Sequence, residues 1–422
     1  MKKKHSIGKY IVIAVLCAVV AILTIFSFKL PGASKDYDFV GFARAINYGV
    51  EYRGGTVQEY TVQTATSGNV SAGISASATR LKYLLDSEGY NTNTYRNGNN
   101  LVIEFIDDYS PQDIENIINV SPSFSIKTSS EETAEEVVTA KDVSKAYWTT
   151  SGSNNLLVIN FTEEGAGHFA TVISSGTAYF FFGDSSQPLS LDVSSSNSAG
   201  LAITVANSNI GKYYASQIEA SKYDLSYTLQ NTYTITKANA TKNVVVLLTL
   251  TLCIFAGCVA VLILLFKKLG LVGALILLVA LLLQIVLLQA VPETVFTFTS
   301  PAMFASLLCL VLGAVSIYLM FDKMHKEYKL GKILPASIKF GFKKIWATIL
   351  DAYVVLLIPA IITYFLGSFG IKQFAMAMIC GLVVYGTITI VLTKFLAKWL
   401  TYISTKNKDY GFSREAHINE LK

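Results

Sequence analysis

Hydrophobic residues gather in six long runs, and a polar stretch of about 210 residues separates the first run from the other five. Each run is long enough to cross the roughly 30 Å hydrocarbon core of a bilayer as a helix that rises about 1.5 Å per residue. The pattern predicts a membrane protein in which a six-helix bundle (one span, then five) carries one large water-exposed domain. The runs are Ile7–Phe28, Asn243–Phe266, Leu269–Val291, Ser300–Phe321, Ile345–Gly367 and Ile371–Leu396.

The distribution of charge predicts the orientation of these runs. Between Lys29 and Lys242 there are 14 Lys and Arg against 22 Asp and Glu, whereas the rest of the chain holds 20 basic and 7 acidic residues. The basic residues cluster at 2–4, 267–268, 323–344 and 394–408, and basic flanks of membrane helices favour the cytoplasm. Both termini are therefore expected in the cytoplasm, with the polar domain on the other side of the cytoplasmic membrane. The first run is expected to stay as a membrane helix, because no convincing small-x-small cleavage site follows it.

The first part of the polar domain has the pattern of a small ferredoxin-like α+β sheet. Strands and helices alternate there, and Ser110-Pro111 has the residue types that begin a helix. This alternation predicts βαβ elements with the helices on one face of the sheet. The expected elements are strand Val57–Val62, helix Ser75–Ser87, strand Leu101–Ile106, a helix from Ser110 to Ile118 and strand Phe124–Ile126.

A second α+β part follows, and the acidic stretch Glu131–Glu136 is expected to be a linker rather than a helix start. The domains expected are therefore 1–28 (first membrane helix), 29–130 (base), 131–242 (head), 243–396 (five-helix bundle) and 397–422 (cytoplasmic tail). The elements expected in the second part are helix Ala140–Tyr147, strand Leu156–Phe161, helix Thr162–Ser174 capped by Thr162, strands Tyr179–Phe182 and Leu201–Val205, helix Tyr213–Ser221 and strand Leu225–Leu229.

The sequence lacks the motifs of most catalytic chemistry. There is no nucleotide-binding loop, no serine nucleophile elbow and no zinc-protease helix. All five cysteines lie in hydrophobic runs, and the four histidines are scattered singly, so neither disulfides nor a metal site are expected. We therefore expect a protein that is not an enzyme, has no cofactor or metal, and does not bind nucleic acid.

Six stretches, in order along the chain, resemble motifs of the SecD/SecF family, within the resistance-nodulation-division superfamily. The Thr-Ile-Leu-Asp block favours the SecD branch over SecF. The stretches are Tyr48–Gly55 (family Gly-Leu-Asp-Leu-Arg-Gly-Gly), Lys268–Leu271, Phe321–Met324 with Glu327 (family Phe-Glu-Arg-Ile-Arg-Glu-Glu), Gly331–Ala352 with Gly341-Phe342-Lys343 and Thr348–Ala352, Gly370–Ala375, and Phe161–Ala170 (family Phe-Thr-x-Glu-Gly-Ala-x-x-Phe-Ala).

The resemblance implies an accessory subunit of the Sec protein translocase. Such a subunit would use the proton motive force to assist late stages of protein export. The implied partners are a SecF-like subunit, the channel complex of the SecY, SecE and SecG type, an unfolded exported polypeptide and, as a further candidate, a membrane insertase.

One departure from the family concerns the proton path. The family places an Asp-Ala-Asn triplet in the fourth span, where this chain has Gly313–Met320 without an acid. Asp351 is the one acid well inside a hydrophobic run, and a charge there costs about 2.5–3.5 kcal/mol on insertion scales. It is the candidate for proton coupling, or else a structural acid that pairs with Lys343 or Lys344.

Other candidate positions follow from the motifs. Arg53, Gly54 and Gly55 are a candidate hinge between base and bundle, or a tight turn, because glycine permits unusual backbone angles. Phe321, Asp322, Gly341 and Lys343 form the cytoplasmic family motif. Extended polypeptide is expected to bind at sheet edges and exposed aromatic side chains. The aromatic candidates are Tyr147, Trp148, Tyr179–Phe182, Tyr213 and Tyr214.

Two alternatives of other classes stay open. A scaffold subunit without proton coupling agrees with the missing fourth-span acid. Half of a lipid or small-molecule exporter agrees with the wider superfamily.

Overall fold

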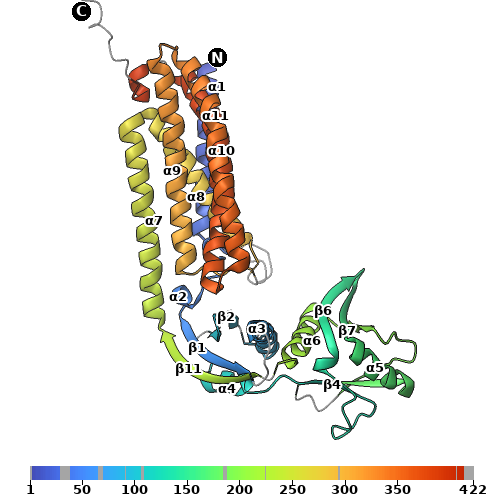
Figure 1. Cartoon of the computed structure of the whole chain (residues 1–422). Coiled ribbons are helices and arrows are strands. Elements are labelled where there is room, and N and C mark those ends of the chain that lie inside the picture. The colour runs from blue at the N-terminus through green and yellow to red at the C-terminus, as the bar shows by residue number, and fades with distance from the viewer. Residues whose placement is uncertain are drawn as a thin grey trace, which may run out of the picture. The chain divides into compact units, whose positions relative to one another are not determined.

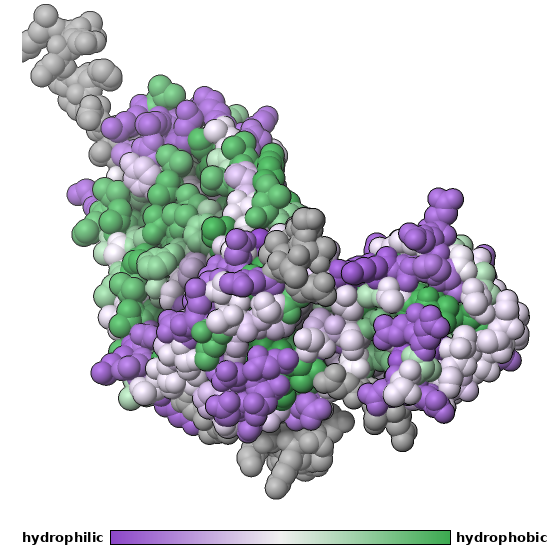
Figure 2. Space-filling view, turned by 60° about the horizontal axis from the view of Figure 1, so that its bottom comes forward, coloured by the Kyte–Doolittle hydropathy of each residue, from purple (hydrophilic) through white to green (hydrophobic). Residues whose placement is uncertain are grey.

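The computed structural model describes residues 2–28, 39–64, 70–90, 92–105, 109–183, 188–223, 225–292, 295–404 and 406–412. They belong to two compact units, one formed by Met1–Tyr52 with Thr241–Lys422 and the other by Arg53–Ala240. Figure 2 shows hydrophobic residues gathered over the helical unit, while hydrophilic residues prevail over the other.

The first unit is a helical bundle. Among the described residues, five helices are long and apolar enough to cross a membrane, and α1 (Lys2–Ile25) adds the shorter apolar stretch Tyr10–Ile25. All six predicted runs lie in helices apart from a few end residues, because uninterrupted apolar sequence has no other way to satisfy its backbone in lipid. The five long helices are α7 (Lys237–Phe266), α8 (Lys268–Ala290), α9 (Ser300–Lys329), α10 (Leu334–Leu366) and α11 (Phe369–Ile403).

The helices of the bundle differ in how much of their apolar surface is buried within this chain. Helices α8, α9 and α11 supply most of its hydrophobic core, and α10 adds a narrow buried stripe that includes Ile349, Tyr353 and Ala360. Helix α7 lies at the edge of the bundle (Figure 1), and its apolar side chains are mostly exposed in this chain. In a membrane, such faces contact lipid or another protein.

The second unit begins with a four-stranded antiparallel sheet in the order β11-β1-β3-β2. With α3 and α4 this is the βαββαβ order of a ferredoxin-like fold, which confirms that part of the prediction. Its hydrophobic core includes Tyr60, Leu81, Ile103 and Ile114. The elements are β1 (Gly55–Thr64), α3 (Val70–Ser87), β2 (Thr92–Asn97), β3 (Asn100–Phe105), α4 (Pro111–Ile118) and β11 (Leu225–Ile235).

The last strand of this sheet was predicted wrongly. Phe124–Ile126 belongs to β4, which pairs with β5 and β8 in another sheet, and β11 takes the place expected for it. Residues between α4 and β11 thus form an insertion in the ferredoxin-like fold. Glu131–Glu136 lies in the loop between the paired strands β4 and β5, so it does not separate two domains. Ile106, the last residue of one predicted strand, lies outside the described residues.

The insertion has its own hydrophobic core, which includes Ile126, Leu157, Phe169 and Phe180. A sheet β5-β4-β8-β9 and a sheet β10-β7-β6 contribute to it, together with α5 and α6. The elements are β4 (Phe124–Lys127), β5 (Val138–Thr139), the short helix η2 (Ala140–Asp142), β6 (Val143–Ser151), β7 (Asn154–Phe161), α5 (Glu163–Ser175), β8 (Thr177–Phe182), β9 (Leu189–Asp192), β10 (Gly200–Val205) and α6 (Ser208–Ser221).

The helix predicted at Ala140–Tyr147 is wrong. After η2 the chain continues as β6, with a register irregularity between Val143 and Lys145 where it pairs with β7. That irregularity buries Val143 and Ala146, three residues apart, which mimics helical spacing. By contrast, Thr162 caps α5 as predicted, since its hydroxyl accepts the Gly165 amide at 3.0 Å.

Candidate functional site

Asp351 lies on the exposed face of α10. Within the described part of the chain it has no hydrogen-bond or ion-pair partner, so it does not pair with Lys343 or Lys344. Lys344 contacts Glu327 instead. The acid is about 10 Å beyond Lys344 along the helix, among apolar neighbours such as Leu350 and Val354, which are also exposed. This carboxylate therefore faces outward from the bundle.

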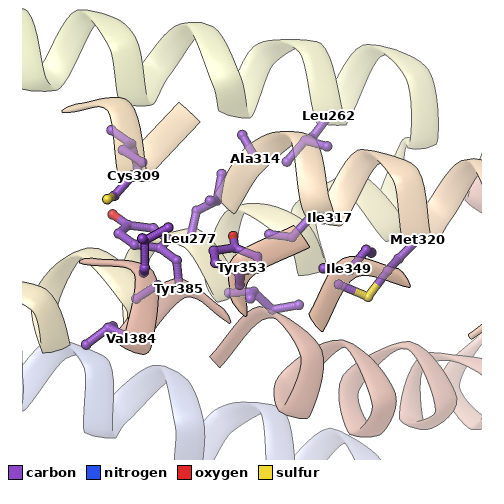
Figure 3. Close-up of a cluster of buried hydrophobic side chains, with 14 of the residues drawn as sticks. Leu262, Leu277, Cys309, Ala314, Ile317, Met320, Ile349, Tyr353, Val384 and Tyr385 are labelled. Carbon is purple, nitrogen blue, oxygen red and sulfur yellow. The ribbon is translucent and has the colours of Figure 1, made fainter. Parts of the chain in front are cut away.

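The interior beside Asp351 is polar but uncharged. The Ser316 hydroxyl donates to the Tyr353 hydroxyl at 3.1 Å, and the Thr389 hydroxyl donates to the Tyr385 carbonyl at 2.6 Å. Figure 3 shows the Tyr385 hydroxyl directed toward the sulfur of Cys309 in the hydrophobic core. The side chain of Gln284 on α8 is 1% exposed, and neither of its polar atoms has a partner among the described residues. These groups can hold hydrogen bonds across helices, but they carry no charge at this depth.

An ionic cluster joins the C-terminal end of α9 to the loop that follows it and to the N-terminal part of α10. Glu327, which is 1% exposed, accepts hydrogen bonds from Lys332 and, at 2.6 Å, from Lys344. One turn before it on α9, Asp322 pairs with Lys326 at 2.7 Å. Phe321, Asp322, Gly341 and Lys343 of the expected cytoplasmic motif thus lie at this end of the two helices, with Phe321 buried and Lys343 exposed.

A C-terminal segment, Lys406–Phe412, packs against the same end of the bundle. The Phe412 ring stacks on His325 with 4.9 Å between centroids, and the Tyr410 hydroxyl donates to the Ser404 carbonyl at 2.8 Å. Hydrogen bonds from Lys268, at 2.8 Å, and from Ser404 hold the pKa of Asp409 below its ordinary value. No local pattern marks this packed segment apart from its cluster of lysines.

The candidate hinge lies where the chain passes from one unit to the other, between Tyr52 and Arg53. Gly54 has φ = 82° and Gly55 has φ = 147°, angles that favour glycine. A Cβ on Gly54 would lie 3.2 Å from the Ile235 carbonyl oxygen. A tight turn explains these glycines, and motion at this point remains a prediction.

The second unit has a cavity of about 660 Å³ lined by residues of α3, α6 and neighbouring loops. Tyr90, Phe182, Tyr213 and Tyr214 line it, and the rings of Phe182 and Tyr214 stack with 4.1 Å between centroids. Arg80 lines it too, donating to Gln217 of α6 and, at 2.9 Å, to the Val120 carbonyl. Aromatic side chains and polar groups thus share the walls of this cavity, which makes it the candidate binding site of the unit.

The aromatic candidates from the sequence divide between this cavity and other places. The cavity is lined by Phe182, Tyr213 and Tyr214. Phe180 is buried in the hydrophobic core of the insertion, and Phe181, also in β8, is buried outside that core. Trp148 lines a second cavity of about 480 Å³ beside Lys212, whose ammonium lies 5.1 Å from the centre of the indole. Tyr147 is exposed and Tyr179 partly buried, away from both cavities.

No family model matches the chain. The chain is 29% identical over 141 residues to the protein translocase subunit SecD of Acidaminococcus fermentans, which covers 33% of this chain and 33% of that protein. It is 35% identical over 86 residues to SecD of Magnetococcus marinus, covering 20% of this chain and 16% of that protein. These alignments span about a third or less of the length of the curated relatives.

Solved structures extend the likeness to nearly the whole chain. A crystal structure of SecDF in a super-membrane-facing form matches 95% of this chain and 58% of its own, with a TM-score of 0.64 and 16% identity. A SecDF from Thermus, described as a translocon-associated membrane protein, gives a TM-score of 0.54 over 95% of this chain and 59% of its own, again at 16% identity. At 16% identity the solved structures show only that the fold is shared. The similarity of sequence is shown by the curated relatives.

The chain is similar to SecD proteins in parts of its sequence, and to SecDF in its fold. It is a membrane protein with a large α+β domain, as predicted from its hydrophobic pattern. At two positions of its SecD-like stretches, only glycine fits beside the neighbouring backbone. A Cβ on Gly341 would lie 2.5 Å from the Met324 Cα, and a Cβ on Gly165 would lie 2.1 Å from the Asp142 carbonyl oxygen.

Two further residues of this chain, Gln284 and Glu51, were not predicted to matter by themselves. Gln284 was not considered, although an amide in an otherwise apolar run is a visible signal. Glu51 was treated only as part of a motif, and its contact with Ser300 spans 249 residues of sequence. No local pattern could have identified that pair.

Proposed function

We propose that this chain is an accessory subunit of a bacterial protein translocase that assists export of unfolded polypeptide across the cytoplasmic membrane. It acts beside a SecF-like subunit and the Sec channel complex, has no catalysis of its own, and draws on the proton motive force. The observation that carries the proposal is the match to SecDF over 95% of the chain, joined with the curated SecD relatives.

The proposed orientation places Arg53–Ala240 outside the cell and both termini inside. The ionic cluster of Glu327 and the lysines around the C-terminal segment support a cytoplasmic position for that end of the bundle. The division of the outer unit into base and head stays a proposal, with β11 assigned to the base. The head is then the insertion with its own core.

The cavity beside α3 and α6 is the proposed contact for the exported chain. Its stacked rings offer apolar surface to side chains of any sequence, and the hydroxyl of Tyr213 in its wall can meet a main-chain amide. Broad selectivity of this kind suits a protein that handles many unfolded clients.

Asp351 is the proposed site of proton coupling. An outward-facing acid in an apolar face is costly in lipid, so it is expected to meet a donor on a neighbouring membrane helix. A carboxyl whose pKa depends on that donor can take up and release a proton as the two helices move. The SecF-like subunit is the proposed source of the donor.

We expect Asp351→Asn to slow export toward the level of cells that lack the chain, and to remove the dependence of the remaining export on the proton gradient. The measurement is pulse–chase secretion of a reporter, with and without a protonophore. Leu350→Asn is the matched control, since it adds an amide at the adjacent exposed position and keeps the acid. Co-purification from membranes tests the SecF-like and channel partners.

A second function, a scaffold without proton coupling, is favoured by the uncharged groups around Tyr353 and Tyr385. Under that function, Asp351→Asn leaves the response to the protonophore as it is in the parent, while deletion of the chain still slows export. If deletion leaves secretion unchanged and no channel protein co-purifies, neither translocase function holds.

A further inference from the structure

The segment Asn47–Tyr52, which we call the junction segment, is paired by its backbone to the residues just before α9. The Phe298 amide donates to the Asn47 carbonyl at 2.7 Å, and the Gly49 amide donates to the Phe298 carbonyl at 3.0 Å. Tyr48 and Phe298 form a parallel bridge, and their rings meet edge to face at 5.5 Å. The chain leaves the helical unit directly after this segment.

Glu51 of the junction segment caps the start of α9. Its carboxylate accepts the Ser300 amide at 2.7 Å and the Ser300 hydroxyl as well. The first amides of a helix have no partner within it, and the positive end of the helix dipole favours an anion there. Thr299, at the N-cap position, makes no side-chain cap. Glu51, from a distant part of the sequence, therefore supplies the hydrogen-bond acceptor for the first turn of α9 that Thr299 does not supply.

Further hydrogen bonds tie the same place to other helices. Asn243 of α7 donates to the Glu51 carbonyl at 2.8 Å. The Thr297 amide donates to Gln373 of α11 at 2.8 Å, and Gln373 is 5% exposed. The Tyr52 ring packs against Phe298 with 5.8 Å between centroids. The junction segment is thus bonded directly to α7 and α9, and the residues before α9 with which it pairs are bonded to α11.

We propose that Glu51 is a positioning residue that transmits movement of α9 to the chain entering the outer unit. A charge-assisted cap at 2.7 Å makes the junction segment follow the N-terminus of α9, so that a shift of α9 displaces Arg53, two residues after Glu51. In this proposal the backbone changes its angles only after Tyr52, where the chain enters the second unit. This coupling rests on the proposed function in export, whereas the cap itself does not.

Hydrogen exchange of the full-length protein in detergent tests the cap. In Glu51→Ala the Ser300 amide, the first of α9, loses its acceptor and should exchange at least about tenfold faster, as expected for a lost hydrogen bond to a charged group. Glu51→Gln retains an acceptor of the same reach, so it should restore part of the protection. It also covers the case in which the alanine variant does not fold. Glu135→Ala, at an exposed acid of the outer unit, controls for the loss of charge.

Secretion of the reporter by the same variants tests the coupling. We expect export to fall in the order parent, Glu51→Gln, Glu51→Ala, with membrane levels and co-purifying partners unchanged. Unchanged exchange in α9 of Glu51→Ala and Glu51→Gln overturns the cap. Faster exchange with parental export, in cells where deletion of the chain slows export, overturns the coupling. Secretion that survives deletion overturns the proposed function together with the coupling, and exchange alone then decides whether the cap exists.

Discussion

Two glycines of α5 differ only in what lies beside them. Gly165 faces η2, where an added Cβ would stand 2.1 Å from the Asp142 carbonyl oxygen, whereas Gly167 on the exposed side has no atom within 4 Å of such a Cβ. The close approach lets the Thr162 amide donate to that same carbonyl at 2.8 Å. The glycine of the Phe161–Ala170 stretch is therefore needed for packing at the start of α5.

We predict that Gly165→Ala lowers the stability of the second unit by about 1–3 kcal/mol, because the methyl group forces η2 away from α5. Gly167→Ala, the matched control, should be neutral or stabilising by about 0.5–1 kcal/mol, since alanine is the better helix former. Thermal unfolding of the full chain in detergent, with hydrogen exchange to locate the change, measures both. Equal stability of the two variants would refute the steric account.

At the scale of elements, the C-terminal segment joins helices that are distant in sequence. Lys268 at the start of α8 pairs with Asp409, and His325 near the end of α9 stacks on Phe412. Tyr410 is fully buried between these contacts. The segment therefore stabilises one end of the bundle through one ion pair and a small aromatic core.

We predict that Asp409→Asn speeds hydrogen exchange of residues 404–412 several-fold at neutral pH, because the Lys268 bond loses its charge. The folded pKa of Asp409 is lowered, so its contribution is complete above the ordinary value of 3.8 and is lost as the pH falls through the folded value. The difference between variant and parent, compared at equal pH, should disappear in that acidic range. A difference that persists there would show that charge is not the cause.

Much of this could be predicted from sequence, and the failures have physical reasons. Hydrophobic runs and the Thr162 cap were predictable because the signals are local. The strand at Val143–Ser151 was missed because a register irregularity gave its buried residues helical spacing. Strand β11 could be recognised as a strand, but not as the partner of β1, because that pairing joins residues about 170 positions apart. The exposed position of Asp351 likewise depends on tertiary packing and not on its neighbours in sequence.

On the scale of the whole molecule, the two units are connected at two points, between Tyr52 and Arg53 and between Ala240 and Thr241. The first connection combines the fixed junction segment with the glycines that follow it. The glycines that permit unusual backbone angles thus come just after Tyr52. This arrangement supports the proposed hinge at Arg53, Gly54 and Gly55.

We predict that Gly54→Ala impairs export more than Gly89→Ala does. The two glycines have nearly the same φ, 82° and 85°, so each substitution carries a similar backbone cost of about 1–2 kcal/mol. Both glycines lie in the second unit, but Gly89 has open space around it and is far along the chain from the junction segment, which Gly54 follows closely. Secretion assays, normalised to membrane levels, compare them. Equal export by the two variants would remove the hinge and leave a tight turn.

The strands β1 and β11 have a practical consequence for anyone who wishes to cut or relabel the chain. They run side by side from Gly55 opposite Ile235 to Thr64 opposite Leu225, so the chain enters and leaves the ferredoxin-like sheet through this one pair of hydrogen-bonded strands. A break in the backbone at a turn of the insertion, such as Ser151–Asn154, leaves the pairing of β1 with β11 intact. Two fragments produced separately should therefore reassemble, and a fluorophore or protease site can be introduced there without releasing either half.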